Sequence, residues 1–322
     1  MFAEIALTPQ VFDEHSNTDK DLWLESLYEL GRGIFPRIAA CPVIISDLYG
    51  GGWCDLVKNN LDDIVDHRVK RRVMEIYQQM KNYLSKRPSE LSWPDDEEGW
   101  VKEINCSHGK EAFSRIMLSD VCFQGYVSDG KPVHSINHAN EERSGFWDCI
   151  RSDGDVEMDI NKQISLLRPI CLHADYMALR TTYVAGGDDD ETAFVATLIE
   201  SACNRPSGYH ELAFFELHLD GSRIENFDTV THNIVEKIRE CLSKHVELRV
   251  YYWPHFTDRE LVAGHFSDGK KYQRWGISFN HIARPIDRSG STRWHIIRQR
   301  DLENIMVDTA SDRIIRQFSI VV

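Results

Sequence analysis

The chain has 322 residues and a formal net charge of -14, and 42% of its residues are hydrophobic. Two domains are expected, because this length exceeds the size at which one hydrophobic core usually keeps growing. The acidic charge excludes a protein that coats nucleic acid non-specifically, since such binding depends on many lysine and arginine contacts to phosphates. The net charge does not exclude a small basic cleft that binds phosphate.

The expected location is the cytoplasm. The first residues, MFAEIALTPQVF, lack a basic segment followed by an apolar run and a cleavage site, so no signal peptide is predicted. No apolar stretch reaches the ~18 residues of a membrane span. The eight cysteines are scattered without a CxxC pair, which is typical of reduced thiols and not of a zinc site. We therefore expect no metal and no cofactor.

The first half predicts a module that is α/β or mostly helical and has no assigned role. A helix over 61–84 carries a basic run, Arg68 to Arg72, with apolar residues on its opposite side. The other predicted elements are a strand over 4–12, a helix over 18–34, a strand over 43–48 that ends at Tyr49 and three glycines, and an acidic loop over 88–99.

A polar segment separates this module from the rest of the chain. Residues 125–159 are rich in glycine, serine, asparagine and aspartate and show little periodicity, as expected of a crossover between domains. We place the boundary so that residues 1–155 form the N-terminal module and residues 156–322 the second domain.

The second domain alternates between helices and strands. A helix that leads to a strand is predicted over 164–178, helices over 191–203 and 229–245, and strands over 181–185, 212–219, 247–253, 260–262, 276–281 and 294–297. This alternation predicts an α/β fold with a parallel or mixed sheet that helices cover on both faces.

Three short motifs follow one another in this domain. They are Phe215-Glu216-Leu217-His218, Thr257-Asp258-Arg259-Glu260-Leu261-Val262 and Arg274-Trp275-Gly276-Ile277. Their order resembles the phospholipase D-like domain at the C terminus of MIT-domain proteins and of bacterial proteins from anti-phage defence loci. The resemblance covers the chain from about Ser165 to Val322.

The resemblance implies a phosphodiesterase in which a histidine attacks phosphorus and a lysine of an HxK motif stabilises the phosphoryl oxygens. This chain has no HxK at the expected strand, and Thr257 stands where the family has a histidine before Asp-Arg. The nearest imidazole is two residues earlier, and an arginine could replace the lysine as a phosphate clamp. The candidate catalytic residues are therefore His255, His218, Asp258, Arg259 and Glu216.

Each candidate has a structural alternative. Glu216 and His218 alternate correctly to share one face of a strand, where they would form either a phosphate pocket or a polar network that stabilises the sheet. His255 is either a nucleophile or a loop histidine that caps or packs. His173 and Asp175 stand at another strand end, with the same two alternatives.

A local excess of arginine near the C terminus is the candidate nucleic-acid footprint. Phosphate contacts there would be accompanied by stacking on a tryptophan, and the alternative is ion pairing with the acidic N-terminal module. The residues are Arg274, Arg284, Arg288, Arg293, Trp294 and Arg298.

Acidic residues suggest a cation site in two places. Asp13, Asp47, Asp55 and Asp120 lie near predicted strand ends, as in PIN-like nucleases that hold divalent metal, although aspartates there also cap helices and turns. The run Asp188 to Glu191 directly precedes a helix, so capping is the favoured interpretation.

Two functions remain open. One is a nuclease or phosphodiesterase subunit of a bacterial anti-phage defence complex, assembled as a homodimer. The other is a catalytically inactive subunit that binds nucleic acid, or that acts as a scaffold or sensor for a protein partner such as an ATPase or effector. Membrane recognition is disfavoured by the acidic charge.

Overall fold

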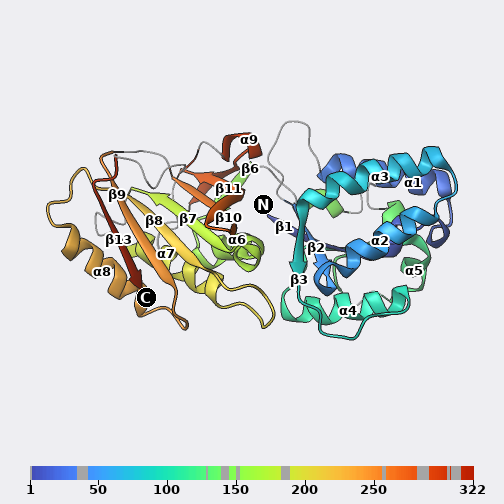
Figure 1. The fold of residues 1–322 in the computed structure, drawn as a ribbon, viewed down its shortest axis with the longest axis horizontal. Helices are drawn as coiled ribbons and strands as arrows, with labels where there is room; N and C mark the ends of the chain where they lie inside the picture. Colours follow the sequence, from blue (N-terminus) through green and yellow to red (C-terminus); the bar gives the residue numbers. More distant parts are fainter. Residues whose placement is uncertain are drawn as a thin grey trace. The chain divides into compact units, whose positions relative to one another are not determined.

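The structure is a computed structural model that describes residues 2–34, 43–127, 130–138, 145–149, 153–182, 189–255, 259–280, 290–302, 305 and 313–322. The chain divides into two compact units, Phe2–Arg151 with Pro206–Gly208, and Ser152–Arg205 with Tyr209–Val322. This division lies next to the boundary predicted at 155/156. Each unit combines a sheet with helices, so the chain is α/β as predicted (Figure 1). Among the described helices, none has the length and apolar character of a membrane span.

The N-terminal unit contains a parallel five-stranded sheet of order β3-β2-β1-β4-β5. The strands are β1 (Ala3–Leu7), β2 (Val43–Leu48), β3 (Leu84–Arg87), β4 (Arg115–Leu118) and β5 (Val133–Ser135). The α-helices are α1 (Lys20–Ile34), α2 (Gly52–Asp63), α3 (His67–Met80), α4 (Glu97–Lys110) and α5 (Asp120–Gly125). β1 and β2 are buried at every residue, as expected of central strands covered on both faces.

Two predictions for this unit differ from the structure. The span 61–84, predicted as one helix, holds the end of α2, then α3, and it reaches β3 at Leu84. The break lies before α3, where the Asp66 side chain accepts hydrogen bonds from the N–H groups of Arg68 and Val69 and caps a new helix. The strand predicted over 4–12 ends at Leu7, and a short 3-10 helix, η1 (Pro9–Phe12), follows. α4 was not predicted, because its apolar face is narrow.

A buried ion pair connects β1 to β3 across β2. The guanidinium of Arg87 donates to Glu4 Oε1 at 2.9 Å, and both side chains are almost fully buried. Arg87 also donates to the hydroxyl and carbonyl of Ser107 on α4, and Ser46 donates to Glu4. These bonds satisfy both charges inside the core and hold α4 against the sheet.

Glu4→Gln should destabilise the N-terminal unit by about 3 kcal/mol, because it leaves the Arg87 charge buried without its counter-ion. The urea midpoint of unfolding of the full chain measures this loss. Glu98→Gln is the matched control, since Glu98 forms an exposed pair with Lys102 and should change the midpoint little. Equal midpoints for the two variants would contradict the assignment.

The C-terminal unit contains a mixed eight-stranded sheet of order β13-β9-β8-β7-β10-β11-β12-β6. The strands are β6 (Asp153–Glu157), β7 (Tyr176–Thr181), β8 (Phe214–Asp220), β9 (Glu247–Trp253), β10 (Glu260–Ser267), β11 (Lys270–Phe279), β12 (Ser291–Ile296) and β13 (Arg316–Val321). The helices are α6 (Ile160–His173), α7 (Asp189–Cys203), α8 (Phe227–Arg239) and α9 (Gln299–Leu302). β7, β8 and β9 are parallel to one another.

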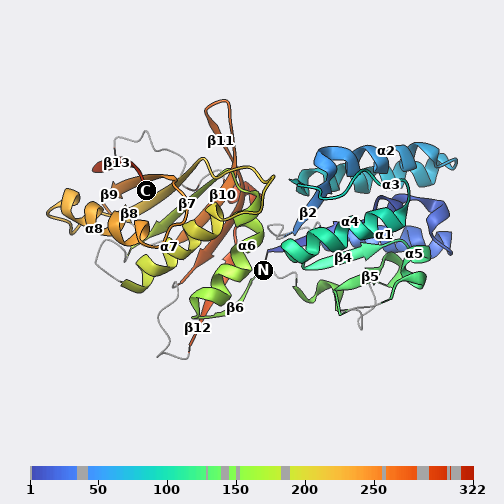
Figure 2. The ribbon, with the colours of Figure 1, turned by 90° about the horizontal axis from the view of Figure 1, so that it is seen from below.

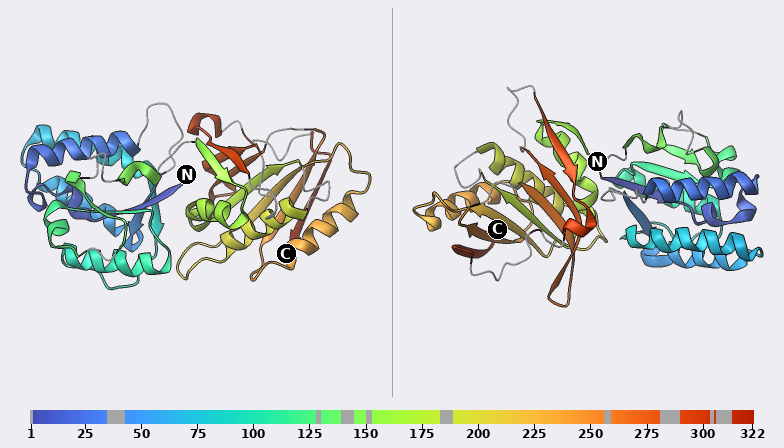
Figure 3. Two further views of the ribbon diagram at one scale, coloured as in Figure 1. Left: turned by 180° about the vertical axis from the view of Figure 1, so that it is seen from behind. Right: turned by 90° about the horizontal axis from the view of Figure 1, so that it is seen from above.

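One face of this sheet packs against three helices. Thr181, Leu219 and Tyr252 form one row across β7, β8 and β9. Thr181 donates to Glu191 of α7, and the Tyr252 hydroxyl bonds Thr231 of α8. α6, α7 and α8 lie side by side along this face (Figure 2), and the same layering is visible from two other sides (Figure 3).

The opposite face carries polar and charged side chains. The neighbouring row runs through Glu260, Arg180, His218 and Tyr251, and alternation along each strand places it on the face away from α7 and α8. Helices were expected on both faces. In the part of the chain that the structure describes, only the short α9 packs here, where Leu302 lies against Gly276 of β11.

Candidate functional site

The polar face of the C-terminal sheet is organised around the carboxylate of Glu216. Its side chain is 1% exposed, and Lys271 Nζ donates to both carboxylate oxygens at 2.7 and 2.6 Å. Burial alone would raise the pKa of Glu216, but His218 and the Lys271 charge outweigh burial and hold it below its ordinary value. Glu216 is therefore an ionised, fully paired carboxylate.

His218 lies two residues further along β8 and is also 1% exposed. Trp253 Nε1–H donates to His218 Nδ1 at 3.0 Å, so the neutral ring carries its proton on Nε2, which lies 3.5 Å from a Glu216 oxygen. The ring stacks on Tyr251 with centroids 4.9 Å apart. Both nitrogens face protein groups and neither is accessible.

This arrangement decides what the network can do. A nucleophilic histidine needs an unprotonated nitrogen that can approach a phosphorus atom. The protonated Nε2 of His218 points at Glu216, and Nδ1 already accepts from Trp253. As it stands, the network stabilises the sheet and offers no nucleophile, which agrees with the structural alternative for Glu216 and His218.

Lys271→Met should destabilise the C-terminal unit by about 3 kcal/mol, because it removes the cation that bonds both oxygens of the buried Glu216 and leaves only Arg249, 3.9 Å away, as a counter-charge. Lys270→Met is the matched control, since Lys270 is the exposed neighbour at the start of β11. The urea midpoint of each variant measures the difference. Adding Glu216→Gln to Lys271→Met should restore much of the loss, and failure to do so would show that the charge is not its origin.

His218 should make stability depend on pH. Burial lowers its pKa below the ordinary value, so the unfolded imidazole, with a pKa of about 6.5, binds a proton that the folded one does not. The stabilisation is complete above about pH 6.5 and decreases as the pH falls below it. His218→Gln should therefore flatten the decrease in urea midpoint between neutral pH and mild acid. The control is His232→Gln, at an exposed position on α8, which should leave the pH dependence of the urea midpoint as in the wild type. An unchanged pH dependence in His218→Gln would contradict this account.

His255 lies at the carboxyl edge of the parallel strands, directly after β9. Its side chain is 72% exposed, and Nδ1 lies 3.6 Å from a carboxylate oxygen of Asp220, the last residue of β8. The carboxylate faces Nδ1 and leaves Nε2 towards solvent. Of the predicted catalytic histidines, this is the one that a substrate could reach, at the edge where ligands of α/β sheets usually bind.

Arg259 lies at the same edge but is not next to Glu216. It precedes β10, which pairs with β7, so β7 separates it from β8. The Arg259 guanidinium donates to the Asn280 carbonyl at 2.8 Å and to the Thr182 hydroxyl at 3.0 Å. These bonds assign it to holding the strand ends together. Asp258, predicted beside it, lies outside the described residues.

A second polar chain runs through Arg274, which was predicted to bind nucleic acid. Arg274 Nη1 lies 3.0 Å from Nε2 of His265, and Nδ1 of His265 lies 3.2 Å from Asp175. Because arginine can only donate, His265 accepts at Nε2 and donates from Nδ1. Burial would raise the pKa of Asp175, but the hydrogen bonds from His265 and the N–H of Phe266 hold it below its usual range.

The remaining predicted footprint is only partly available to a phosphate backbone. Trp294 is fully buried and packs against Phe279, so its ring cannot stack on a base in this conformation, contrary to expectation. Arg293 is exposed but pairs with Asp153 at 3.1 Å. Arg298 is exposed. Arg284 and Arg288 lie outside the described residues.

A carboxylate occupies the carboxyl edge of the N-terminal sheet between β1 and β4. This is where the strand order reverses, the usual ligand crevice of such sheets. Glu97 of α4 accepts there from the Thr8 hydroxyl and from the N–H and hydroxyl of Ser119. The negative charge and its three donors fill the position that a phosphate would take.

The aspartates considered for a metal have separate roles. Asp13 bonds His15 and Ser16 at the start of a 3-10 helix, η2 (Glu14–Ser16), and Asp120 accepts from Thr18, Gln124 and Ser135. Within the described residues, no three acidic, histidine or cysteine side chains are grouped to hold a metal ion. Asp55 is exposed, and Asp47 is buried near the end of β2.

The acidic run before α7 is split by the limits of the described residues. α7 begins at Asp189, and Glu191 in its first turn accepts from Thr181. The Glu191 bond attaches the start of the helix to the end of β7. Asp188 lies outside the described residues.

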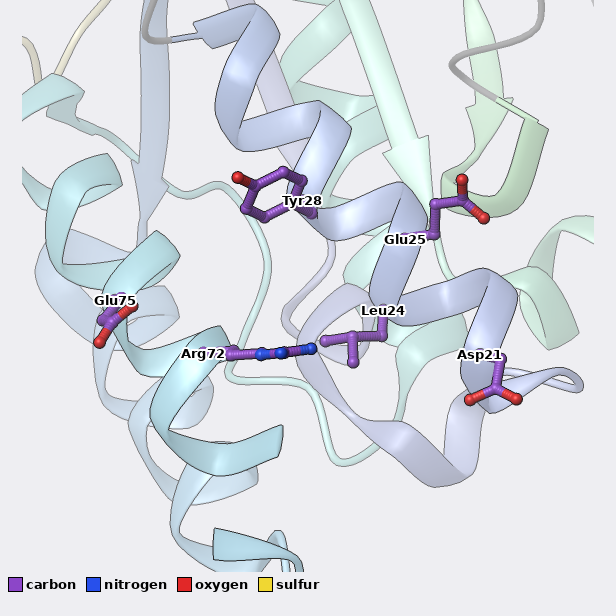
Figure 4. Close-up of a pocket in the computed structure, with 6 residues that line it drawn as sticks. All are labelled: Asp21, Leu24, Glu25, Tyr28, Arg72 and Glu75. Carbon is purple, nitrogen blue, oxygen red and sulfur yellow. The ribbon is translucent and has the colours of Figure 1, made fainter. Parts of the chain in front are cut away.

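A surface groove of about 510 Å³ lies between α1 and α3 of the N-terminal unit. Figure 4 shows Arg72 of the basic run pointing from α3 towards Leu24 of α1, with Tyr28 and Glu75 beside them. Asp21 and Glu25 complete its lining. None of the residues predicted to be catalytic lines this groove.

Comparison with known proteins returns no match, either to a family model or to a curated protein. The local geometry of the two units therefore carries the functional argument.

Lys271, Trp253 and His265 are the members of these two polar networks that the sequence did not indicate. A signal for Lys271 was present, because Asp268-Gly269 is the dipeptide that favours a tight hairpin turn. Both residues adopt positive φ, 52° and 74°, between β10 and β11. A hairpin there predicts long paired strands in place of the short ones expected, and puts Lys271 on a strand. The sequence does not predict that Lys271 bonds the carboxylate of Glu216.

Proposed function

We propose that the chain is a catalytically inactive subunit that acts as a scaffold or sensor for a protein partner, and that its phospholipase D-like C-terminal unit no longer cleaves phosphodiesters. In line with the resemblance, the complex it serves would be a bacterial anti-phage defence complex. The observation that carries the proposal is the buried network of Glu216, His218 and Lys271, in which Lys271 bonds both carboxylate oxygens, Trp253 bonds Nδ1 of His218, and Nε2 of the buried histidine faces Glu216.

The arginines favour a protein partner over nucleic acid. Arg259, Arg274 and Arg293 each bond a group of this chain, and the predicted stacking tryptophan is buried. A net charge of -14 adds a repulsion towards phosphates that these few cations do not offset. Binding to a protein partner, unlike binding to nucleic acid, does not require several arginines or lysines that are free to contact phosphates.

A second candidate is a phosphodiesterase centred on His255. It is favoured by the exposed imidazole whose Nδ1 faces Asp220. In this orientation Nε2 could attack phosphorus and form a phosphohistidine while the bond to one ester oxygen breaks; that oxygen takes a proton from water, and the carboxylate stabilises the charge on the imidazole. In this alternative the Glu216 network supports the sheet beneath the site.

A cleavage assay separates the two functions. The purified chain, incubated with single-stranded and duplex DNA, RNA and a chromogenic phosphodiester, should release no product. Cleavage that disappears in His255→Ala and persists in His232→Ala, the exposed control on α8, would overturn the main proposal and establish the second. Cleavage lost in His218→Gln with folding intact would also overturn it.

Binding measurements test the kind of partner. If the partner is a protein, its affinity for this chain should change little with added salt, and DNA or RNA should bind weakly or not at all. Tight nucleic-acid binding whose affinity falls steeply with salt would show phosphate recognition. In that case Arg298→Ala should reduce the salt slope, whereas Lys270→Ala, on the β10–β11 hairpin, serves as the comparison.

A further inference from the structure

The basic run of α3 carries an arginine that has no counter-ion among the described residues. Arg72 is exposed and lines the groove of about 510 Å³ between α1 and α3. Its neighbour Arg71 pairs with Glu75 at 3.2 Å, so that pair is neutral. Arg68, one helical turn before Arg72 and on the same side of α3, is also exposed. The α3 side of the groove is therefore positive.

The negative charges of the groove lie on α1. Asp21 and Glu25 are exposed, one turn apart on this helix, and both line the groove. In Figure 4 they lie on the side of α1 away from Arg72, which reaches α1 at the level of Leu24. Neither carboxylate forms an ion pair in the part of the chain that the structure describes. Within one chain, α1 keeps these opposite charges apart.

Apolar side chains of α1 are exposed beside these charges. Tyr28 is 53% exposed and Leu22 is 39% exposed, and Leu24, in the groove, is half-buried. Burial of apolar surface is the main favourable contribution to protein association. The outer side of α1 therefore presents an apolar strip bounded by carboxylates, which suits a helix that packs into a groove between two others.

The charges of this surface are complementary to a second copy of the same surface. A two-fold axis parallel to α1 would bring α1 of each copy into the groove between α1 and α3 of the other. Arg72 of each copy would then lie against the outer side of the opposite α1, where Asp21 and Glu25 are exposed. A partner segment of one charge sign would face a like charge on one side of the groove, so a second copy is the better fit.

We infer that α1 of a second copy of this chain occupies the groove between α1 and α3, so that the groove is the interface of a homodimer. Arg72 of each copy pairs with Asp21 and Glu25 of the other. Leu24 and Tyr28 of both copies form the apolar centre between them. This interface belongs to the N-terminal unit and is independent of the function proposed for the C-terminal unit.

Sedimentation velocity and light scattering of the full chain test the inference at about 100 μM, where a dimer of micromolar affinity is mostly formed. The wild type should be a dimer. Arg72→Glu should raise its dissociation constant by about tenfold or more, because like charges then face each other across the interface. Glu25→Arg should weaken the dimer to a similar degree, for the same reason.

Mixing these two variants separates a lost contact from a lost fold. In a pair made of one Arg72→Glu chain and one Glu25→Arg chain, both contacts again join opposite charges. The mixture should therefore associate with nearly the affinity of the wild type, and more tightly than either variant alone. Unfolding of a variant could not produce this rescue.

Lys102→Glu is the matched control, because it makes the same change of charge at an exposed position on α4. It should dimerise as the wild type does, and the urea midpoint of each variant checks its folding. A monomeric wild type would overturn the inference. So would a dimer that neither charge reversal weakens, or a mixture that associates no more tightly than the separate variants.

Discussion

The ion pair between Glu216 and Lys271 is the constraint on which the polar face of the C-terminal sheet depends. A carboxylate with 1% exposure is stable only if a cation and hydrogen-bond donors replace the water it has lost. Lys271 supplies the cation from β11. In the sheet, β7 and β10 lie between β11 and the strand of Glu216, β8. Pairing the charge in this way attaches the hairpin to the centre of the sheet and fixes the surroundings of His218.

The same pairing changes the meaning of the Glu-x-His motif. Two residues of alternating strand geometry share a face whether they serve catalysis or packing, so the motif alone does not distinguish the two roles. Here Trp253 donates to one imidazole nitrogen and Glu216 faces the other. The histidine that remains reachable is His255, at the strand ends, and it pairs with Asp220, which no motif indicated.

The N-terminal unit uses buried carboxylates in two different ways. Glu97 lies in the crevice where the strand order reverses and is satisfied by Thr8 and Ser119. Asp47 keeps one buried oxygen, Oδ1, without a described protein donor, and its other oxygen, Oδ2, faces Gly51. Both place a carboxylate at the carboxyl edge of a parallel sheet, where negative charge disfavours a phosphate.

The alternation of apolar runs with helical periods determined, from sequence alone, that the chain is α/β, and it located the main helices and the strands β2, β8 and β9. These features depend on side-chain periodicity within one element, which is local. Elements whose pattern is weak, such as α4, and the break before α3 were missed because a single cap or a narrow apolar face decides them. Trp294 was placed on the strand but on the wrong side of it: it was expected to stack on a base and is buried. The alternating pattern of a strand does not tell which of its sides faces the core.

The site depended on tertiary structure throughout. Glu216 and His218 could be placed on one face from their spacing, but their partners Lys271, Trp253 and Tyr251 come from other strands. Whether a histidine is a nucleophile or a packed ring is set by which groups reach its two nitrogens, and those contacts form only when distant segments pair. The sequence by itself determined the class of fold and the residues capable of chemistry, and the folded sheet decided which of them are bonded and which remain accessible.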